Sequence, residues 1–195
     1  EHGDVPEPPV PVDEMIEHTK SVYVQPALAS GWHYLACDAY GVCASFEYIN
    51  GHLVISTGPQ MTWPVLTNDT YPDSLRFLTQ FLEFGGTNPA PYGDQSSLGR
   101  FAVTADMLRQ KNISSFGIDR AFEILDQVKQ STRIATRVST VYDMRERKVY
   151  FKTINNSNVR SFTFGTPVGS CKQPVTYYNV EDEGRGTIDK NFQEF

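Results

Sequence analysis

The sequence lacks the basic runs and the long apolar runs that mark nucleic-acid-binding and membrane-spanning proteins. Its 195 residues carry a formal net charge of −6, and the densest charged cluster, MRERK at 144–148, is typical of a solvated hairpin tip rather than of a phosphate-binding patch. No apolar stretch approaches the roughly 20 residues that a helix needs to cross a bilayer. We therefore expect neither a nucleic-acid partner nor a membrane span.

Metal and cofactor motifs are also missing. The three cysteines (Cys37, Cys43 and Cys171) have no CxxC spacing, the four histidines lie apart, and no glycine-rich phosphate loop is present. We therefore expect no metal and no cofactor. Cys37 and Cys43 flank the turn signal DAYG and could face each other across a hairpin, but buried free thiols are the favoured interpretation.

The chain begins with a polar, proline-rich stretch, EHGDVPEPPVPVDE, which is not a signal peptide. The prolines predict an extended arm over residues 1–12. Asp13 is expected to cap a short helix that ends before Pro26. The first residue is Glu rather than Met, and we expect a processed, trimmed or partial chain.

What the sequence does contain is a globular composition with clearly punctuated strands. Hydrophobic residues make up 39% and aromatic residues 12%, enough for a sizeable core. The Asn50-Gly51 pair between apolar runs is a strong signal of a hairpin turn. The expected strands are 32–38, 42–49, 52–56 and 63–67, followed much later by 136–144, 148–154 and 159–164.

Three segments with helical periodicity lie between these two groups of strands. They are 72–84, which stops at the Gly85-Gly86 pair, then 96–110 and 117–130. Ser96 or Ser97 is expected to cap the second of them. The tail from Gly165 onward is expected to be irregular. Strands, then helices, then strands predict an α+β fold of antiparallel sheets with helices packed on them.

Two polar residues stand out at the ends of predicted elements. Asn68 ends a predicted strand, where a turn explains it as well as an amide presented to a developing negative charge. Arg100 lies in the first turn of a predicted helix, where a cation opposes the helix dipole, and an exposed or salt-bridged arginine explains it equally well. His33 is expected to be a packed structural residue, and the scattered carboxylates show no acid–base pair.

Four stretches taken in order resemble the choloylglycine hydrolase family. They are WHYLACDAYGVCASFEYINGHLVI, VLTNDTYPDS, LGRFAVTADML and STVYDMRERKVYFKTINNSNVRSFTF, and the match extends from about Trp32 to Phe164. The family contains bile-salt hydrolases and penicillin V acylases, which are N-terminal-nucleophile (Ntn) amidases. The resemblance implies a partial αββα Ntn-hydrolase sandwich without a cofactor. It also implies a homo-oligomer, typically a homotetramer, in the bacterial cytoplasm or periplasm.

The resemblance also gives the two polar residues a role. Asn68 matches the asparagine of the family's T-N motif, which binds the oxyanion, and Arg100 matches the arginine that lies close to the nucleophile. The family's nucleophile is a cysteine exposed at the N-terminus by processing, which Glu1 is not. We therefore expect residues 13–195 to be the C-terminal portion of a single Ntn-hydrolase domain. Its nucleophile segment would then be missing or present as a second chain.

The expected activity is hydrolysis of linear amide C–N bonds in acylated small molecules, of the penicillin V acylase or conjugated-bile-salt hydrolase type. One alternative is a non-catalytic fragment or binding module with the same fold. Another is a different Ntn amidase, such as an acid-ceramidase-like enzyme.

Overall fold

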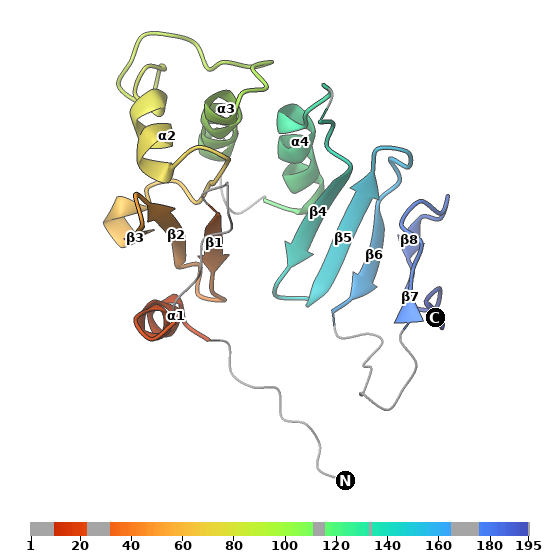
Figure 1. Ribbon diagram of the computed structural model, residues 1–195. Helices are drawn as coiled ribbons and strands as arrows, with labels where there is room; N and C mark the ends of the chain where they lie inside the picture. Colours follow the sequence, from red (N-terminus) through yellow and green to blue (C-terminus); the bar gives the residue numbers. More distant parts are fainter. Residues whose placement is uncertain (1–9, 23–31, 111–115, 133, 165–175, 195) are drawn as a thin grey trace. The chain divides into compact units, whose positions relative to one another are not determined.

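A computed structural model describes residues 10–22, 32–110, 116–132, 134–164 and 176–194 (Figure 1). The chain divides into two compact units, 1–109 and 110–195. Residues 1–9 of the predicted arm and Cys171 lie outside the described residues. The single domain expected over 13–195 stays a prediction.

The first unit contains the predicted antiparallel meander. Its strands β1 (His33–Cys37), β2 (Cys43–Ile49) and β3 (His52–Thr57) lie in the order β1-β2-β3, and the short 3-10 helix η1 (Gly58–Gln60) follows. Asn50 and Gly51 have φ values of 52° and 82°, the left-handed pair that a type I′ turn requires. This hairpin is therefore confirmed.

The strand predicted at 63–67 is wrong. Val65 N–H donates to the Trp63 carbonyl at 2.8 Å, and the Tyr71 hydroxyl bonds both the N–H and the carbonyl of Trp63, at 3.1 and 3.0 Å. The main-chain groups that a sheet ladder would need are thus used locally. Val65 is nevertheless buried, which explains why the segment reads as a short apolar strand.

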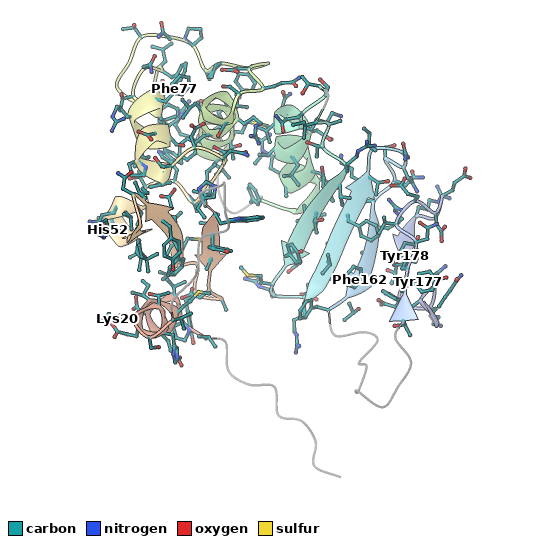
Figure 2. The ribbon with its side chains drawn as sticks, in the orientation of Figure 1. Lys20, His52, Phe77, Phe162, Tyr177 and Tyr178 are labelled. Carbon is teal, nitrogen blue, oxygen red and sulfur yellow. A yellow bond between two sulfur atoms is a disulfide. The ribbon has the colours of Figure 1, made fainter. Side chains whose placement is uncertain are left out.

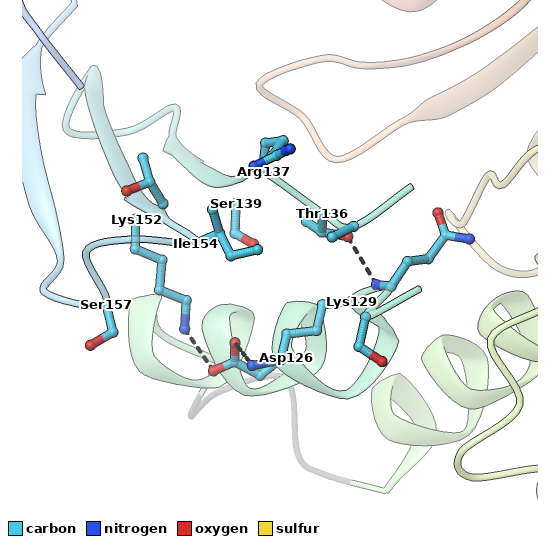
Figure 3. Close-up of a pocket in the computed structure, with 12 residues that line it drawn as sticks. Asp126, Lys129, Thr136, Arg137, Ser139, Lys152, Ile154 and Ser157 are labelled. Atoms are coloured by element: carbon cyan, nitrogen blue, oxygen red, sulfur yellow. Dashed lines mark hydrogen bonds and ion pairs between the residues drawn. The ribbon is translucent and has the colours of Figure 1, made fainter. Parts of the chain in front are cut away.

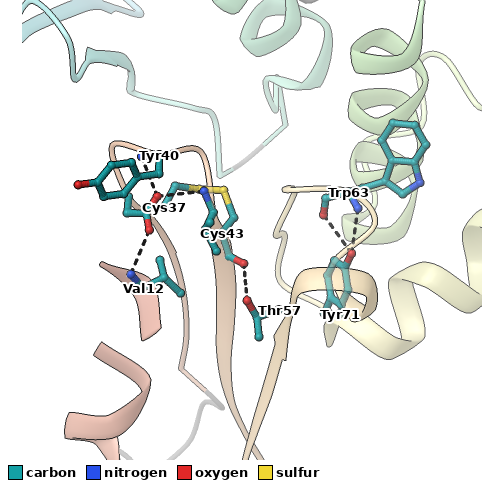
Figure 4. The surroundings of a disulfide bond; sticks show 9 residues. Val12, Cys37, Tyr40, Cys43, Thr57, Trp63 and Tyr71 are labelled. Carbon is teal, nitrogen blue, oxygen red and sulfur yellow. Dashed lines mark hydrogen bonds between the residues drawn. A yellow bond between two sulfur atoms is a disulfide. The ribbon is translucent and has the colours of Figure 1, made fainter. Parts of the chain in front are cut away.

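The cysteines of the first hairpin form a disulfide, which corrects the expectation of free thiols (Figure 4). Cys37 pairs directly with Cys43 in the β1–β2 register, and their Cα atoms lie 4.1 Å apart. Asp38 closes the turn between them: its Oδ1 accepts the N–H groups of Tyr40 and Val42 at 2.9 and 3.0 Å. The register of this turn, which the sequence left open, decides the pairing.

Helix α1 (Val12–Thr19) is shorter than predicted, and Asp13 does not cap it. Pro11 occupies the N-cap position without a side-chain hydrogen bond, and the Val12 N–H is accepted at 3.1 Å by Oδ2 of Asp38 (Figure 4). The acceptor lies 26 residues away in the sequence, so no local pattern reveals it. Val12 packs with Ala44 and Phe46 of β2 in a small core.

Helices α2 (Tyr71–Leu78) and α3 (Ser97–Arg109) form the larger core of the first unit. α2 ends at Leu78 rather than at Gly85, because the next residues turn tightly: the N–H groups of Phe84 and Gly86 both donate to the Phe81 carbonyl. A Cβ on Gly86 would lie 2.1 Å from the Gln80 backbone, so only glycine fits there. Leu82, which the helix predicted over 72–84 would place on the same face as Leu78, is 52% exposed.

The second unit consists of helix α4 (Ile118–Val128) beside a sheet in which strands β4 (Val138–Asp143), β5 (Lys148–Thr153) and β6 (Arg160–Thr163) pair antiparallel (Figure 1). The order β4-β5-β6 and the charged tip at 145–147 agree with the prediction. The tail is not wholly irregular, because it contains the two-residue strands β7 (Thr176–Tyr177), β8 (Gly186–Thr187) and β9 (Gln193–Glu194), of which β8 pairs in parallel with β6.

The tail is held to the second sheet by aromatic rings and by one buried cation. Phe162 and Tyr178, labelled in Figure 2, each contact the ring of Phe192, the first edge to face and the second tilted, at centroid distances of 5.9 and 6.1 Å. Arg160 is fully buried. It donates from Nη1 to the carbonyls of Val180 and Asp182, and its guanidinium carbon lies 4.6 Å from the centroid of the Phe151 ring.

Candidate active site

The structure brings Asn68 and Arg100 into direct contact. Arg100 Nη2 donates to Asn68 Oδ1 at 2.8 Å, across 32 residues of sequence. Asn68 is exposed and Arg100 is half-buried. Arg100 Nε is buried and has no hydrogen-bond acceptor within the described part of the chain. The guanidinium is therefore bound to a neutral amide and carries a charge that no described carboxylate balances.

Ser97 fixes the turn that carries Asn68. Its hydroxyl accepts the Asp69 N–H at 2.7 Å and donates to the Thr67 hydroxyl at 3.1 Å, and Thr67 in turn donates to the Ser97 carbonyl at 3.0 Å. The residues on both sides of Asn68 are thus tied to the start of α3. Arg100 lies on that same turn of helix, and this places its side chain beside the asparagine.

Sequence reasoning missed this role of Ser97. Ser96 is the helix cap, since its hydroxyl accepts the Gly99 N–H at 3.1 Å, and this confirms one of the two predicted caps. The second serine was therefore free for a distant bond. A doubled serine at a helix start, where one suffices, is the signal that could have found it.

Directly after Asn68 in the sequence, the N-terminus of α2 is capped by two side chains, those of Thr70 and Glu47. The Thr70 hydroxyl accepts the Asp73 N–H at 3.3 Å and donates to the Asp73 carboxylate at 2.7 Å. The Tyr71 N–H donates to both carboxylate oxygens of Glu47, at 2.9 and 3.1 Å. Glu47 is 1% exposed, and His33 Nδ1 lies 3.3 Å from its Oε1. His33 therefore has the structural contact that was expected of it.

The Tyr71 hydroxyl serves structure rather than proton transfer. Burial raises the pKa of Tyr71 above its ordinary value; the hydrogen bond to the Trp63 main chain opposes this, and the Glu47 charge adds to it. The phenol therefore stays protonated at neutral pH and holds Trp63 in place (Figure 4).

The cavities of the second unit contain neither predicted residue. One of about 380 Å³ lies at the end of α4 and is lined by Asp126, which forms a hydrogen-bonded ion pair with Lys152 at 2.6 Å and a longer ion pair with Lys129 at 3.8 Å (Figure 3). Another, of about 290 Å³, is lined mainly by apolar and aromatic side chains. Within the described ranges no three metal-ligating side chains cluster, and no helix is long and apolar enough to span a membrane.

Comparison with known proteins places the fold. No protein-family model matches the chain, and a search of curated proteins also found no match. Among solved structures, penicillin V acylase from Agrobacterium tumefaciens superposes with a TM-score of 0.73 at 22% identity, over 95% of this chain and 63% of the acylase. This chain has the penicillin V acylase fold. The α+β fold of the Ntn-hydrolase type, predicted from the sequence, is thereby confirmed.

Two structures of conjugated bile acid hydrolase from Clostridium perfringens, both single-residue variants, match the same fold more distantly. Each gives a TM-score of 0.58 at 17% identity, over 84% of this chain and 53% of the hydrolase. The chain thus spans between about half and two thirds of the length of these enzymes.

Proposed function

We propose that this chain belongs to the choloylglycine hydrolase family and is part of an amidase for linear C–N bonds in acylated small molecules. Its substrates would be of the penicillin V or conjugated-bile-acid type. The observation that carries the proposal is the bond between Arg100 and Asn68. The likeness in fold to an acylase and to a bile acid hydrolase supports it.

The contact with Arg100 determines how Asn68 presents its amide. A guanidinium has only donors, so the amide atom that faces it must be the oxygen. The Nδ2 hydrogens then remain to donate elsewhere. A fixed amide donor aimed at a developing oxyanion typically contributes a factor of about 10²–10³ in rate. We assign this role to Asn68.

Arg100 would stabilise the nucleophile. An unbalanced guanidinium favours a thiolate and lowers the pKa of a nearby cysteine thiol. In the reaction we propose, the thiolate sulfur attacks the amide carbonyl and the oxyanion forms beside Asn68. The C–N bond breaks as the amine takes the proton that the thiol lost. Water then hydrolyses the thioester and releases the acid and the thiol.

The nucleophile would come from outside the described chain, as the N-terminal cysteine of a missing segment or of a second chain. Cys37 and Cys43 are oxidised to a disulfide, so neither is a thiolate. β1 is an edge strand of its sheet, and its neighbour Trp32 and its own Tyr34 are 57% and 48% exposed. An apolar edge of this kind is suited to pairing with a further segment.

Replacement of Asn68 by alanine in the complete protein tests the proposal. We expect N68A to lower kcat by about 10²–10³-fold with KM nearly unchanged, because the amide acts on the transition state. Hydrolysis of phenoxymethylpenicillin and of a glycine-conjugated bile acid measures it. The matched control is N158A, which removes an exposed asparagine side chain of the second unit. A raised KM with intact kcat would refute the assigned role.

The disulfide also favours a second candidate, a binding module that keeps the fold without catalysis, because it removes two of the three cysteines from chemistry. Intact-mass measurement with N-terminal sequencing of the natural protein separates the two. A chain that begins with cysteine supports the amidase. Its absence supports the module. An acid-ceramidase-like amidase would instead show cleavage into two chains and no turnover of either test substrate.

A further inference from the structure

Glu47 is a carboxylate in the interior of the first unit without a lysine or arginine partner among the described residues. It lies on the central strand β2. A buried charge is costly unless donors surround it. Here the donor is the Tyr71 N–H, which both oxygens accept, and Nδ1 of His33 on β1 lies 3.3 Å from Oε1. The carboxylate is thus satisfied chiefly by a main-chain group of another element.

That main-chain group belongs to the first residue of α2, three residues after Asn68. An anion there also meets the positive end of the helix dipole. The segment 63–71 is consequently anchored at three places: Trp63 by the Tyr71 hydroxyl, the turn around Asn68 by Ser97, and Tyr71 by Glu47. Asn68 lies between the last two anchors.

We propose that Glu47 is a positioning residue for Asn68. The exposed Asn68 side chain has one described hydrogen bond, to Arg100, so its direction depends on where the main chain is held. Ser97 fixes the turn from the α3 side and Glu47 fixes it from the sheet. A displacement of about 1 Å at such a donor can cost about 10²-fold in rate. The inference rests on the proposed role of Asn68 as the oxyanion donor.

Glu47→Gln tests this with little change in volume. The amide keeps one acceptor oxygen but loses the charge and the second acceptor. In the complete protein we expect E47Q to lower kcat about 10-fold, and E47A about 10²-fold, with KM changed less than about 2-fold. E146Q, the same chemical change at the exposed β4–β5 tip, is the matched control. We expect it to leave kcat unchanged.

The double variant separates positioning from a general loss of structure. If Glu47 acts through Asn68, E47Q adds less than about 2-fold to the loss already caused by N68A, because coupled residues are non-additive. A merely structural role lowers the active fraction by the same factor in both backgrounds. That result would overturn the proposal.

Amide hydrogen exchange supplies a readout that does not need activity. We expect faster exchange at residues 67–71 in E47Q and unchanged exchange in β4 and β5. Unchanged exchange at 67–71 would overturn the positioning role. Should N68A itself leave kcat intact, the proposed function fails, while the exchange result still decides whether Glu47 holds the turn.

Discussion

Glu47 in the first unit and Arg160 in the second are both buried side chains with polar head groups in the interior, one acidic and one basic. Each is fully buried on an inner strand of its sheet. Glu47 accepts the N–H of Tyr71, whereas Arg160 donates to the carbonyls of Val180 and Asp182. In both units a charge on the sheet is neutralised mainly by main-chain dipoles of a segment outside that strand. The buried charge fastens that segment to the sheet.

The two units differ in the side chains of the segments that Glu47 and Arg160 hold against their sheets. The segment at Glu47 leads to an exposed asparagine beside Arg100, whose charge has one neutral partner. The segment at Arg160 carries exposed acidic side chains at 181–183, but the guanidinium binds main-chain carbonyls of the segment and faces the Phe151 ring instead. Nε has no hydrogen-bond partner among the described residues in either arginine, so an unpaired Nε alone does not mark a site. The proposed role of Asn68 and Arg100 rests instead on a charge without a described carboxylate next to an oriented amide.

The largest stability effect should come from Arg160→Met. The substitution leaves the Val180 carbonyl without its described donor and removes the cation that faces the Phe151 ring, whereas the Asp182 carbonyl keeps its bond from Asn156 Nδ2. We expect the free energy of unfolding to fall by about 3 kcal/mol. Urea unfolding measures it, with R145M at the exposed tip as control. If R160M is as stable as the parent, an apolar side chain replaces the buried cation without loss of stability. Arg160 would then not fasten the tail to the sheet, and the comparison with Glu47 would fail.

The second-largest stability effect should come from loss of the Cys37–Cys43 disulfide. It should be confined to the first unit, where the described disulfide lies. Opening the short loop closed by Cys37 and Cys43 should cost about 2 kcal/mol on the chain-entropy account. We expect the double serine variant to melt at lower temperature, with protease cleavage increased at β1–β2 and unchanged at β4–β5. Equal sensitivity of both hairpins would contradict this assignment.

The smallest effect is a pH dependence of α1. Burial raises the pKa of Asp38, but main-chain donors led by Val12 and Val42 outweigh it, and the pKa lies below its ordinary value. Since the folded pKa is the lower one, this stabilisation is complete above the unfolded value of about 3.9 and is lost as the pH falls through the folded value.

The protection of residues 12–16 against hydrogen exchange, measured relative to the intrinsic rate at each pH, should therefore fall in acid in the parent protein. D38N, which lacks the charge, should show little such change. The matched control is D143N, because Asp143 accepts main-chain N–H groups at the tip of the second unit. If D38N retains the acid response, another group controls α1.

Features that depend on near neighbours could be predicted from the sequence. The Asn50-Gly51 turn and the serine cap of α3 are each determined by residues that lie within a few positions of one another in the sequence. The acceptor for the start of α1 and the disulfide could not be predicted, because each depends on a contact or a register that only the folded chain defines.

The candidate site divides in the same way. Residue chemistry left Asn68 and Arg100 ambiguous, and the family resemblance selected them. The structure adds that they touch, while their roles stay predictions. Glu47 and Ser97 were missed because their partners lie 24 to 30 residues away in the sequence.

Arg160 has a further consequence for how the tail stays ordered. Converging carbonyls are a common way to hold a metal ion, and the order of such a loop then varies with the concentration of that ion. Here the cation is covalently part of the chain, so its occupancy cannot be diluted. Chelators and changes in ionic composition should leave the 180–184 segment as it is, and only a change in the sequence removes its cation.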